Sequence, residues 1–182
     1  MEEDLGEERV TVIDSATACG GLGLMALAAS AVARAGGDRD AVAARARDTR
    51  EGLKIWFAID TMEFLRRGGR VGAARAWLGS TLKIKPILTV EAEITPVERV
   101  RTSRRAFERM VDYMRSRHED GADGWVVQHI QAPDRADELV ARGREIFGSE
   151  PVFIGEIGPV IGTHVGPGLL GVGGCARSLL EP

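Results

Sequence analysis

Short, apolar, β-branched segments separated by stretches of helical length restrict the fold of this chain more than any other feature. Residues 10–14 (VTVID) and 55–60 (IWFAID) have the composition of buried strands. Between them, residues 21–35 are apolar nearly all round, which predicts a buried helix. Asp38 can cap a second helix that ends near Arg50. This strand–helix–helix–strand order predicts an α/β fold.

The second half of the chain predicts a mixed α/β unit of strand pairs covered by helices. Residues 82–101 predict two strands joined at Glu91 and Ala92. A helix from Thr102 to about His118 places four apolar side chains on one face, and a second helix begins at Pro133. Residues 125–130 predict a further strand, and residues 151–166 one or two last strands broken by glycine. The four apolar residues on the face of the helix that begins at Thr102 are Phe107, Met110, Val111 and Met114.

The arrangement of the elements predicts two units. The chain of 182 residues can form one core of ordinary size, or one domain and part of another. One parallel-type strand with two helices cannot bury itself, so the first strand needs neighbours. We therefore expect residues 1–60 to be the incomplete end of an N-terminal parallel-sheet α/β domain. Residues 61–182 are expected to form a C-terminal α/β domain with a mixed or antiparallel sheet.

Composition excludes several classes of protein. The net charge of −3 gives no whole-protein field that attracts nucleic acid. The first residues, MEEDLGEE, are acidic where a signal peptide is basic, and no apolar run reaches membrane-spanning length. We therefore expect a cytoplasmic protein without stable membrane insertion. Cys19 and Cys175 provide neither a disulfide framework nor a metal-binding set.

The segment FLRRGGRVG is the first candidate site, and a short helix over 61–66 is expected just before it. Gly68 and Gly69 permit positive φ and let another group approach the backbone closely. Arg70 then offers a planar fork of donors that suits a carboxylate or a phosphate. The alternative is a tight turn with a surface arginine, because isolated glycine-rich loops are weak signals.

The segment THVGPG is the second candidate site. His164 is followed by Gly-Pro-Gly, which predicts a rigid turn because Pro167 limits φ. In such a turn His164 can donate a hydrogen bond to an anion. The alternative is a hydrogen-bonded turn histidine with a structural role. His118 and His129 are expected to be structural or solvated.

Motifs for other chemistry are absent from the sequence. The segment CGGLG lacks the Gly-Lys-Ser/Thr ending of a Walker A loop and the glycine spacing of a Rossmann loop. There is no GxSxG, no HExxH and no paired Cys/His ligand set. Asp14 and Asp60 each end a predicted strand, where a cap for the following turn is the favoured role and a catalytic acid the alternative.

An arginine-rich run covers residues 99–118. It contains seven arginines against two acids, Glu108 and Asp112. A solvated helix face is the common explanation of such a run. The alternative is a docking surface for an acidic or phosphate-bearing partner.

Five motifs together resemble the DegV family of bacterial fatty-acid-binding proteins. The resemblance extends from about Val10 to Val172, nearly the whole chain, and the order and spacing of the motifs make it specific. The motifs are VIDSATACGGLGL, FAIDTMEFLRRGGRVG, LKIKPILTV, VRTSRRA and IGPVIGTHVGPGLLGV.

The resemblance implies a long-chain fatty acid in an apolar tunnel, with its carboxylate near the junction of two α/β domains. By motif position, the carboxylate is held by His164 and by Arg70 or Arg67. Cys19 stands where many members have serine, and together with Gly68, Gly69 and Gly166 it completes the expected pocket. We expect the tunnel wall to include Leu24, Ile84, Ile87 and Ile161.

The resemblance also implies a carrier that is no enzyme by itself and needs no cofactor or metal. It would present the fatty acid to a separate ATP-binding kinase subunit that forms an acyl phosphate. Arg101, Arg104 and Arg105 are the expected docking residues for that subunit. The family's upstream Thr and Ser contacts are not in this sequence, so we expect a truncated member that binds weakly and self-associates.

The sequence leaves two alternative functions open. One is an enzyme that acts on a small carboxylate or a phosphate ester with His164 as acid and base. The other is a truncated remnant that folds but binds nothing.

Overall fold

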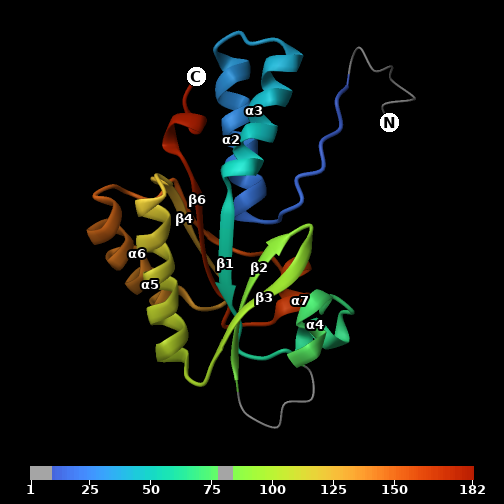
Figure 1. Cartoon of the computed structure of the whole chain (residues 1–182), viewed down its shortest axis with the longest axis vertical. Coiled ribbons are helices and arrows are strands. Elements are labelled where there is room, and N and C mark those ends of the chain that lie inside the picture. Colours follow the sequence, from blue (N-terminus) through green and yellow to red (C-terminus); the bar gives the residue numbers. More distant parts are fainter. Residues whose placement is uncertain (1–9, 78–83) are drawn as a thin grey trace.

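The computed structural model describes residues 10–77 and 84–182, which form one six-stranded mixed sheet with helices on both faces (Figure 1). The strand order is β3-β2-β1-β6-β4-β5. Only the β4–β5 pair is parallel among the described strands. The strands are β1 (Lys54–Ala58), β2 (Lys85–Glu91), β3 (Glu93–Val100), β4 (Gly124–His129), β5 (Phe153–Glu156) and β6 (Leu170–Cys175). The helices are α2 (Gly20–Arg34), α3 (Arg39–Gly52), α4 (Glu63–Arg67), α5 (Ser103–Glu119), α6 (Pro133–Phe147) and α7 (Pro159–Val165), with 3-10 helices η1 (Gly72–Trp77) and η2 (Arg177–Leu180).

The caps and turns form at the residues that the sequence indicated. Asp38 Oδ1 accepts a hydrogen bond of 2.8 Å from the backbone N of Ala41 and begins α3. Thr102 Oγ1 accepts one of 3.1 Å from the backbone N of Arg105 and begins α5. The β2–β3 hairpin turns at Ala92, whose φ is +62°. These local signals need only neighbouring residues, which is why they could be predicted.

Helices α5 and α6 cover one face of the sheet (Figure 1). The four apolar residues predicted on α5 are all buried there. Trp56 of β1 stacks on Tyr113 of α5, with ring centroids 4.1 Å apart. This face therefore carries the main hydrophobic core.

The opposite face is covered at two separate ends (Figure 1). At one end, Leu24 of α2 packs with Leu53 and with Val126 of β4. At the other end, Leu65 of α4 packs with Val165 of α7. Neither α2 nor the α4–α7 pair covers the middle of this face.

Two predicted strands are absent from the described fold. Residues 10–14 form no strand, and Figure 1 shows this segment running beside α2 and α3, apart from the sheet. Its apolar pattern alone could not supply a neighbour for a ladder, and Val12 is 58% exposed. Of residues 151–166, only β5 is a strand, because Pro159 at the first turn favours the helix α7 instead.

Two further expectations need correction. Helix α2 is not buried all round, since Leu22 is 51% and Leu27 41% exposed. The parallel sheet expected within residues 1–60 is not part of the described fold: β1 lies between β2 and β6 and is antiparallel to both. Register and direction depend on distant segments, and a single apolar strand does not reveal them. No helix within 10–77 or 84–182 has the length and hydrophobicity to cross a bilayer.

Candidate functional site

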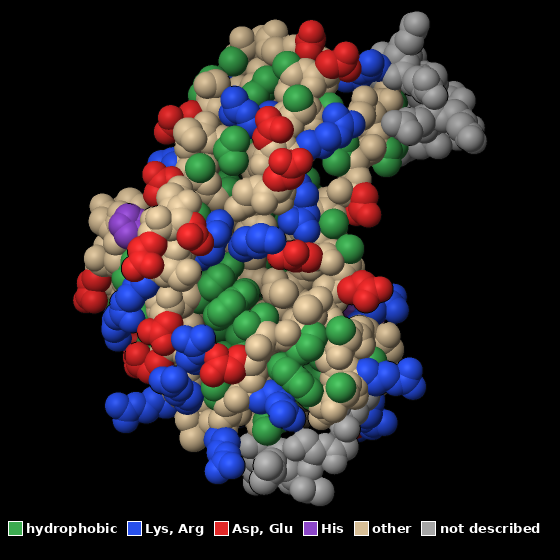
Figure 2. Space-filling view, in the orientation of Figure 1, with side chains coloured by type: hydrophobic (Ala, Val, Ile, Leu, Met, Phe, Trp, Pro, Cys, Tyr) green, Lys and Arg blue, Asp and Glu red, His purple; other side chains and the backbone are tan. Residues whose placement is uncertain are grey.

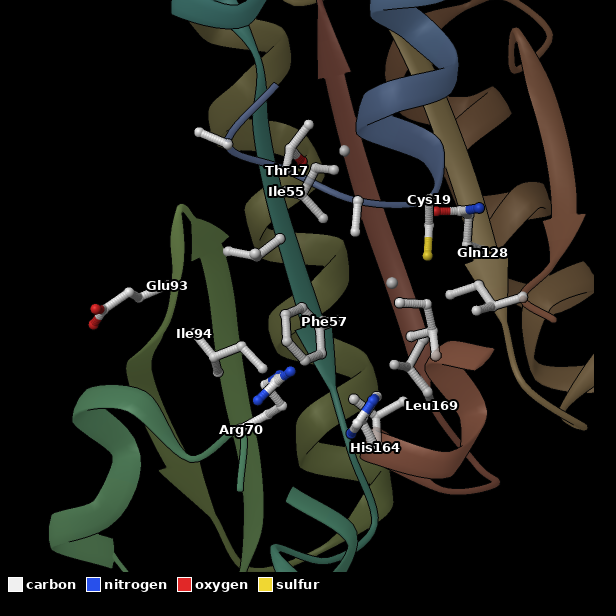
Figure 3. A pocket seen from close by; sticks show the side chains of 18 of the residues that line it. Thr17, Cys19, Ile55, Phe57, Arg70, Glu93, Ile94, Gln128, His164 and Leu169 are labelled. Atoms are coloured by element: carbon white, nitrogen blue, oxygen red, sulfur yellow. The ribbon is translucent and has the colours of Figure 1, made fainter. Parts of the chain in front are cut away.

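The uncovered middle of the sheet is the floor of a cavity of about 550 Å³ (Figure 3). Ligand pockets for small molecules are commonly roughly 300–1,000 Å³. The segment before α2 closes one side, the β2–β3 hairpin another, and α7 the end. The lining residues include Thr17, Cys19, Ile55, Phe57, Gly69, Arg70, Val126, Gln128, Ile161, His164, Leu169, Gly171 and Gly173.

Glycine lets the two candidate loops pack against each other. A Cβ at Gly68 would overlap Nδ1 of His164, so α4 can lie directly against α7 only because Gly68 has no side chain. Gly166 has a φ of +79°, and a Cβ there would overlap the ring of Phe64. The structure thus brings Arg70 and His164 to the same cavity, at the same end of the view in Figure 3.

Arg70 and His164 both have hydrogen-bonding atoms to offer a ligand. The Arg70 side chain is exposed and makes no ion pair with a described residue, while its backbone N donates to Leu65 O at 3.0 Å. His164 is half-buried, and its Nδ1 is buried without a hydrogen-bond partner among the described residues. A carboxylate in the cavity can accept hydrogen bonds from the guanidinium of Arg70 and from the part of the His164 imidazole that does not pack on Gly68. His164 lies in the last turn of α7, not in the open turn that the sequence predicted.

The other end of the cavity holds polar groups that sequence analysis missed. Gln128 Oε1 accepts a hydrogen bond of 2.6 Å from the backbone N of Gly20 and so ties the start of α2 to β4. Thr17 Oγ1 is buried without a partner in the described part of the chain. Thr17 stands within the quoted glycine-rich motif, and Gln128 is the polar residue in a run of apolar ones, so both carried a signal.

Cys19 lies beside this end of the cavity with a φ of +51° (Figure 3). Burial raises the pKa of its thiol above the ordinary value of 9.0. The thiol is therefore protonated near neutral pH and is a poor nucleophile. Within the described ranges, no group of three or more His, Cys, Asp or Glu side chains could hold a metal ion.

Arg67 is not among the residues that line the cavity. Its Nε lies 2.7 Å from Oε1 of Glu63, which also pairs with Arg66 at 2.7 Å. Hydrogen bonds from these two arginines lower the pKa of Glu63 to about 2. Of the two arginines that the sequence could not separate, the cavity contains Arg70.

The expected tunnel residues also divide. Ile161 lines the cavity, and Ile84 is not among the lining residues. Leu24 and Ile87 are fully buried in clusters on either face of the sheet. Apolar pattern predicts burial, but it does not distinguish a core position from a cavity wall.

Asp60, Asp14 and His129 each contact another group of the protein. Asp60 Oδ1 lies 2.6 Å from Lys85 Nζ, and Asp14 Oδ1 accepts from the backbone N of Ala16 at 2.8 Å. His129 is buried, and its Nδ1 accepts from the backbone N of Ala132 at 3.3 Å.

Six of the seven arginines in the arginine-rich run separate into two groups, and the seventh, Arg99, lies over the ring of Trp77. Arg109, Arg115 and Arg117 pair with neighbouring acids. Arg101, Arg104 and Arg105 are exposed around the start of α5 and make no ion pair with a described residue. Figure 2 shows several Lys and Arg side chains gathered near that end of α5.

Comparisons with known proteins agree with one another. A family model described as "Uncharacterised protein, DegV family" matches residues 1–177. A DegV domain-containing protein of Streptomyces coelicolor is 42% identical over 165 residues, which are 90% of this chain and 59% of the relative. One from Clostridium acetobutylicum is 37% identical and is covered over 60% of its length. The chain therefore spans about three fifths of these relatives.

Solved structures share the fold. A DegV family protein from Thermus thermophilus, described as fatty acid binding, superimposes with a TM-score of 0.82 at 32% identity, over 96% of this chain and 63% of that one. A fatty acid binding DegV family protein from Streptococcus agalactiae gives 0.81 at 26% identity, over 96% and 64%. DegV of Bacillus subtilis, described as a fatty acid binding protein, gives 0.80 at 29% identity, over 92% and 60%.

Proposed function

Because the chain belongs to the DegV family, we propose that it binds a long-chain fatty acid in the cavity described above. The observation that carries the proposal is that Arg70 and His164 both line one end of a largely apolar cavity, where neither side chain makes a hydrogen bond or an ion pair with a described residue. Related structures from three bacteria are described as fatty acid binding, which supports the same ligand class.

The apolar wall supplies most of the expected affinity. Burial of an acyl chain contributes about 0.8 kcal/mol per methylene. Hydrogen bonds to a charged head group add about 1.5–3 kcal/mol. A long chain can therefore bind with few polar contacts, and two head-group contacts are enough to fix its direction.

Mass spectrometry of the purified protein tests the ligand class. We expect a long-chain fatty acid to copurify, and the delipidated protein to bind added fatty acid in a calorimetric titration. A copurifying polar metabolite would instead support an enzyme that uses His164. An empty protein that takes up no fatty acid would support a remnant without binding activity.

We also propose that the protein presents the carboxylate to a separate ATP-binding kinase subunit and has no catalytic activity alone. Arg101, Arg104 and Arg105 support this, because their charges are exposed and unpaired within the described structure. Replacing all three with glutamine should leave fatty acid binding and thermal stability unchanged. It should weaken association with the kinase subunit, most strongly at low salt.

A matched variant controls for net charge. Arg34, Arg47 and Arg135 lie on α2, α3 and α6, outside α5 and the residues just before it, and their triple replacement with glutamine removes the same charge. It should leave the association unchanged. If both triple variants weaken it equally, a general field and not a docking surface is responsible. Unfolding of the first variant would show that the run is structural.

We propose further that residues 1–60 contain the end of the family's N-terminal α/β unit. The exposed Leu22 and Leu27 on α2 support this, because apolar helix faces are normally covered. A fusion to the part of the Streptomyces coelicolor relative that this chain does not cover should be more monomeric and bind fatty acid more tightly than the 182 residues alone. Equal mass in solution and equal affinity would contradict the proposal. We also propose that the protein is cytoplasmic, and cell fractionation tests this location.

A further inference from the structure

The floor of the cavity is made of glycine. Along β6, alternate residues face opposite sides of the sheet, so Gly171 and Gly173 share the cavity face. Each glycine lies in register between side chains of the two neighbouring strands. The two rows across β1, β6 and β4 are Phe57–Gly171–Gln128 and Ile55–Gly173–Val126.

These rows form a trough along β6. Neighbouring strands lie about 4.8 Å apart, so β1 and β4 are separated by roughly 9–10 Å across β6. Side chains on β1 and β4 form the two walls, and the glycine backbone forms the bottom. The side chains of β1 and β4 occupy part of that width. The remaining space accommodates one polymethylene chain that lies along β6.

One end of the trough is open and the other is closed. A Cβ at Gly171 would meet its nearest neighbour, Cβ of Phe57, at 3.4 Å, so the floor there is clear. A Cβ at Gly173 would lie 2.7 Å from Cγ1 of Ile55, so that side chain leans over the floor. Cδ1 of Ile55 is also 2.7 Å from the Cβ position of Gly21, at the start of α2. Ile55 therefore closes the trough beneath α2.

The open end leads toward Arg70 and His164. Gly171 is two residues from Leu169, which lines the cavity beside His164 (Figure 3). A ligand whose carboxylate meets Arg70 and His164 would extend over Gly171 first and reach Ile55 last. We propose that the β6 trough selects a single unbranched acyl chain, and that Ile55 stops its methyl end and sets the chain length. This inference rests on the proposed function and specifies the ligand class of the same site.

The first experiment compares ligands on the unmodified protein. Straight hexadecanoate should bind, and its tetramethyl-branched analogue phytanate should bind at least about tenfold more weakly, a difference of about 1.4 kcal/mol. Equal affinity for the two acids would overturn the inference. If the protein binds neither these acids nor any other in a panel of straight acids, the proposed function itself fails.

The second experiment changes the floor. Gly171→Ala adds one methyl to the bottom of the trough without overlapping protein atoms, and should weaken hexadecanoate binding at least about tenfold. Gly155→Ala is the matched control: it lies on β5, does not line the cavity, and its Cβ would meet Gln128 Nε2 at 3.5 Å. The control should bind as the unmodified protein does. Unchanged binding by a folded Gly171→Ala protein would contradict the trough.

The third experiment changes the stop and does not depend on Gly171. Ile55→Val removes the Cδ1 atom beneath α2, and Ile55→Ala removes more of the side chain. Titration with straight acids from dodecanoate to eicosanoate should show the tightest binder moving to longer acids, further for the alanine variant. An unchanged length preference in both variants would show that Ile55 does not set the length.

Discussion

The two faces of the same sheet are packed in different ways. On one face, Trp56, Val127 and Val172 meet α5 and α6 in one continuous core. On the other, the alternate residues Phe57 and Gly171 line a cavity. Because strand residues alternate between faces, one sequence can dedicate one face to stability and the other to binding.

The difference also concerns the covering helices. The α5–α6 pair forms one layer, whereas the cavity face is covered by α2 at one end and by α4 and α7 at the other (Figure 1). An unfilled cavity forgoes dispersion contacts that a packed core has. We therefore expect substitutions on the two faces to separate stability from ligand binding.

The largest expected effect is on the packed face. Leu139 of α6 is fully buried, and Leu139→Ala should lower the free energy of unfolding by about 2–5 kcal/mol. Ile161→Ala, at the half-buried cavity wall, should lower it much less but should weaken fatty acid binding. Urea unfolding of the two ligand-free variants measures both losses of stability. Equal losses of stability would contradict the division of roles between the faces.

The next effect is on the polar end of the cavity. Arg70→Gln and His164→Gln should each weaken the binding of a long-chain fatty acid by about 1.5–3 kcal/mol, because each removes a charge-assisted contact. Arg70→Gln should leave stability unchanged, since the side chain is exposed. Arg67→Gln, at the end of α4 three residues before Arg70, is the matched control, and calorimetric titration should show it to bind normally. If Arg67→Gln binds fatty acid as weakly as Arg70→Gln does, the positive charge near the site, and not one contact of Arg70, determines the affinity.

A smaller effect should follow from the packing of α4 on α7. Gly68→Ala places a methyl where Nδ1 of His164 lies and must displace that imidazole. We expect fatty acid affinity to fall about tenfold, or 1.4 kcal/mol. Gly158→Ala controls for a glycine change next to α7, because a Cβ there meets nothing within 4 Å. If calorimetry gives the same affinity for both variants, His164 does not need its present position.

Local signals in the sequence predicted much of the fold. Asp38 and Thr102 mark the starts of α3 and α5, and the turn at Ala92 joins the predicted hairpin. The helix α7 was missed, because its β-branched residues suggested a strand although Pro159 favoured a helix start. The position of β1 inside the sheet depends on pairing with β6, more than 100 residues later, and no local pattern shows it.

The candidate site was predictable only in part. Two glycine-rich segments that contain Arg70 and His164 indicated these positions, and the structure brings both side chains to one cavity. The polar groups of Thr17 and Gln128 were missed, because their neighbourhood comes from α2 docking on β4. The glycine floor was missed as well, since Gly171 resembles any strand glycine until its register with Phe57 is known.

The smallest expected effect lies outside the cavity, on the surface of α4. Glu63 lies at the surface with 38% of its side chain exposed, and hydrogen bonds from Arg66 and Arg67 lower its pKa from 4.5 to about 2. A lowered pKa in the folded state means that the ionised form stabilises the fold above pH 4.5, and that this contribution is lost as the pH falls toward 2. Glu63→Gln should therefore lower the melting temperature slightly at neutral pH, and the difference from the unmodified protein should vanish at the acid end of that range.

Glu63→Gln alters the surface of α4 beside the site and changes no residue that lines the cavity. Fatty acid affinity at neutral pH should be the same for Glu63→Gln and the unmodified protein, since Arg67 does not line the cavity. Melting curves across the acid range and one calorimetric titration check both statements. A loss of affinity would mean that the Glu63 pairs hold the Arg70 loop in its binding position, so that the surface of α4 belongs to the binding face after all.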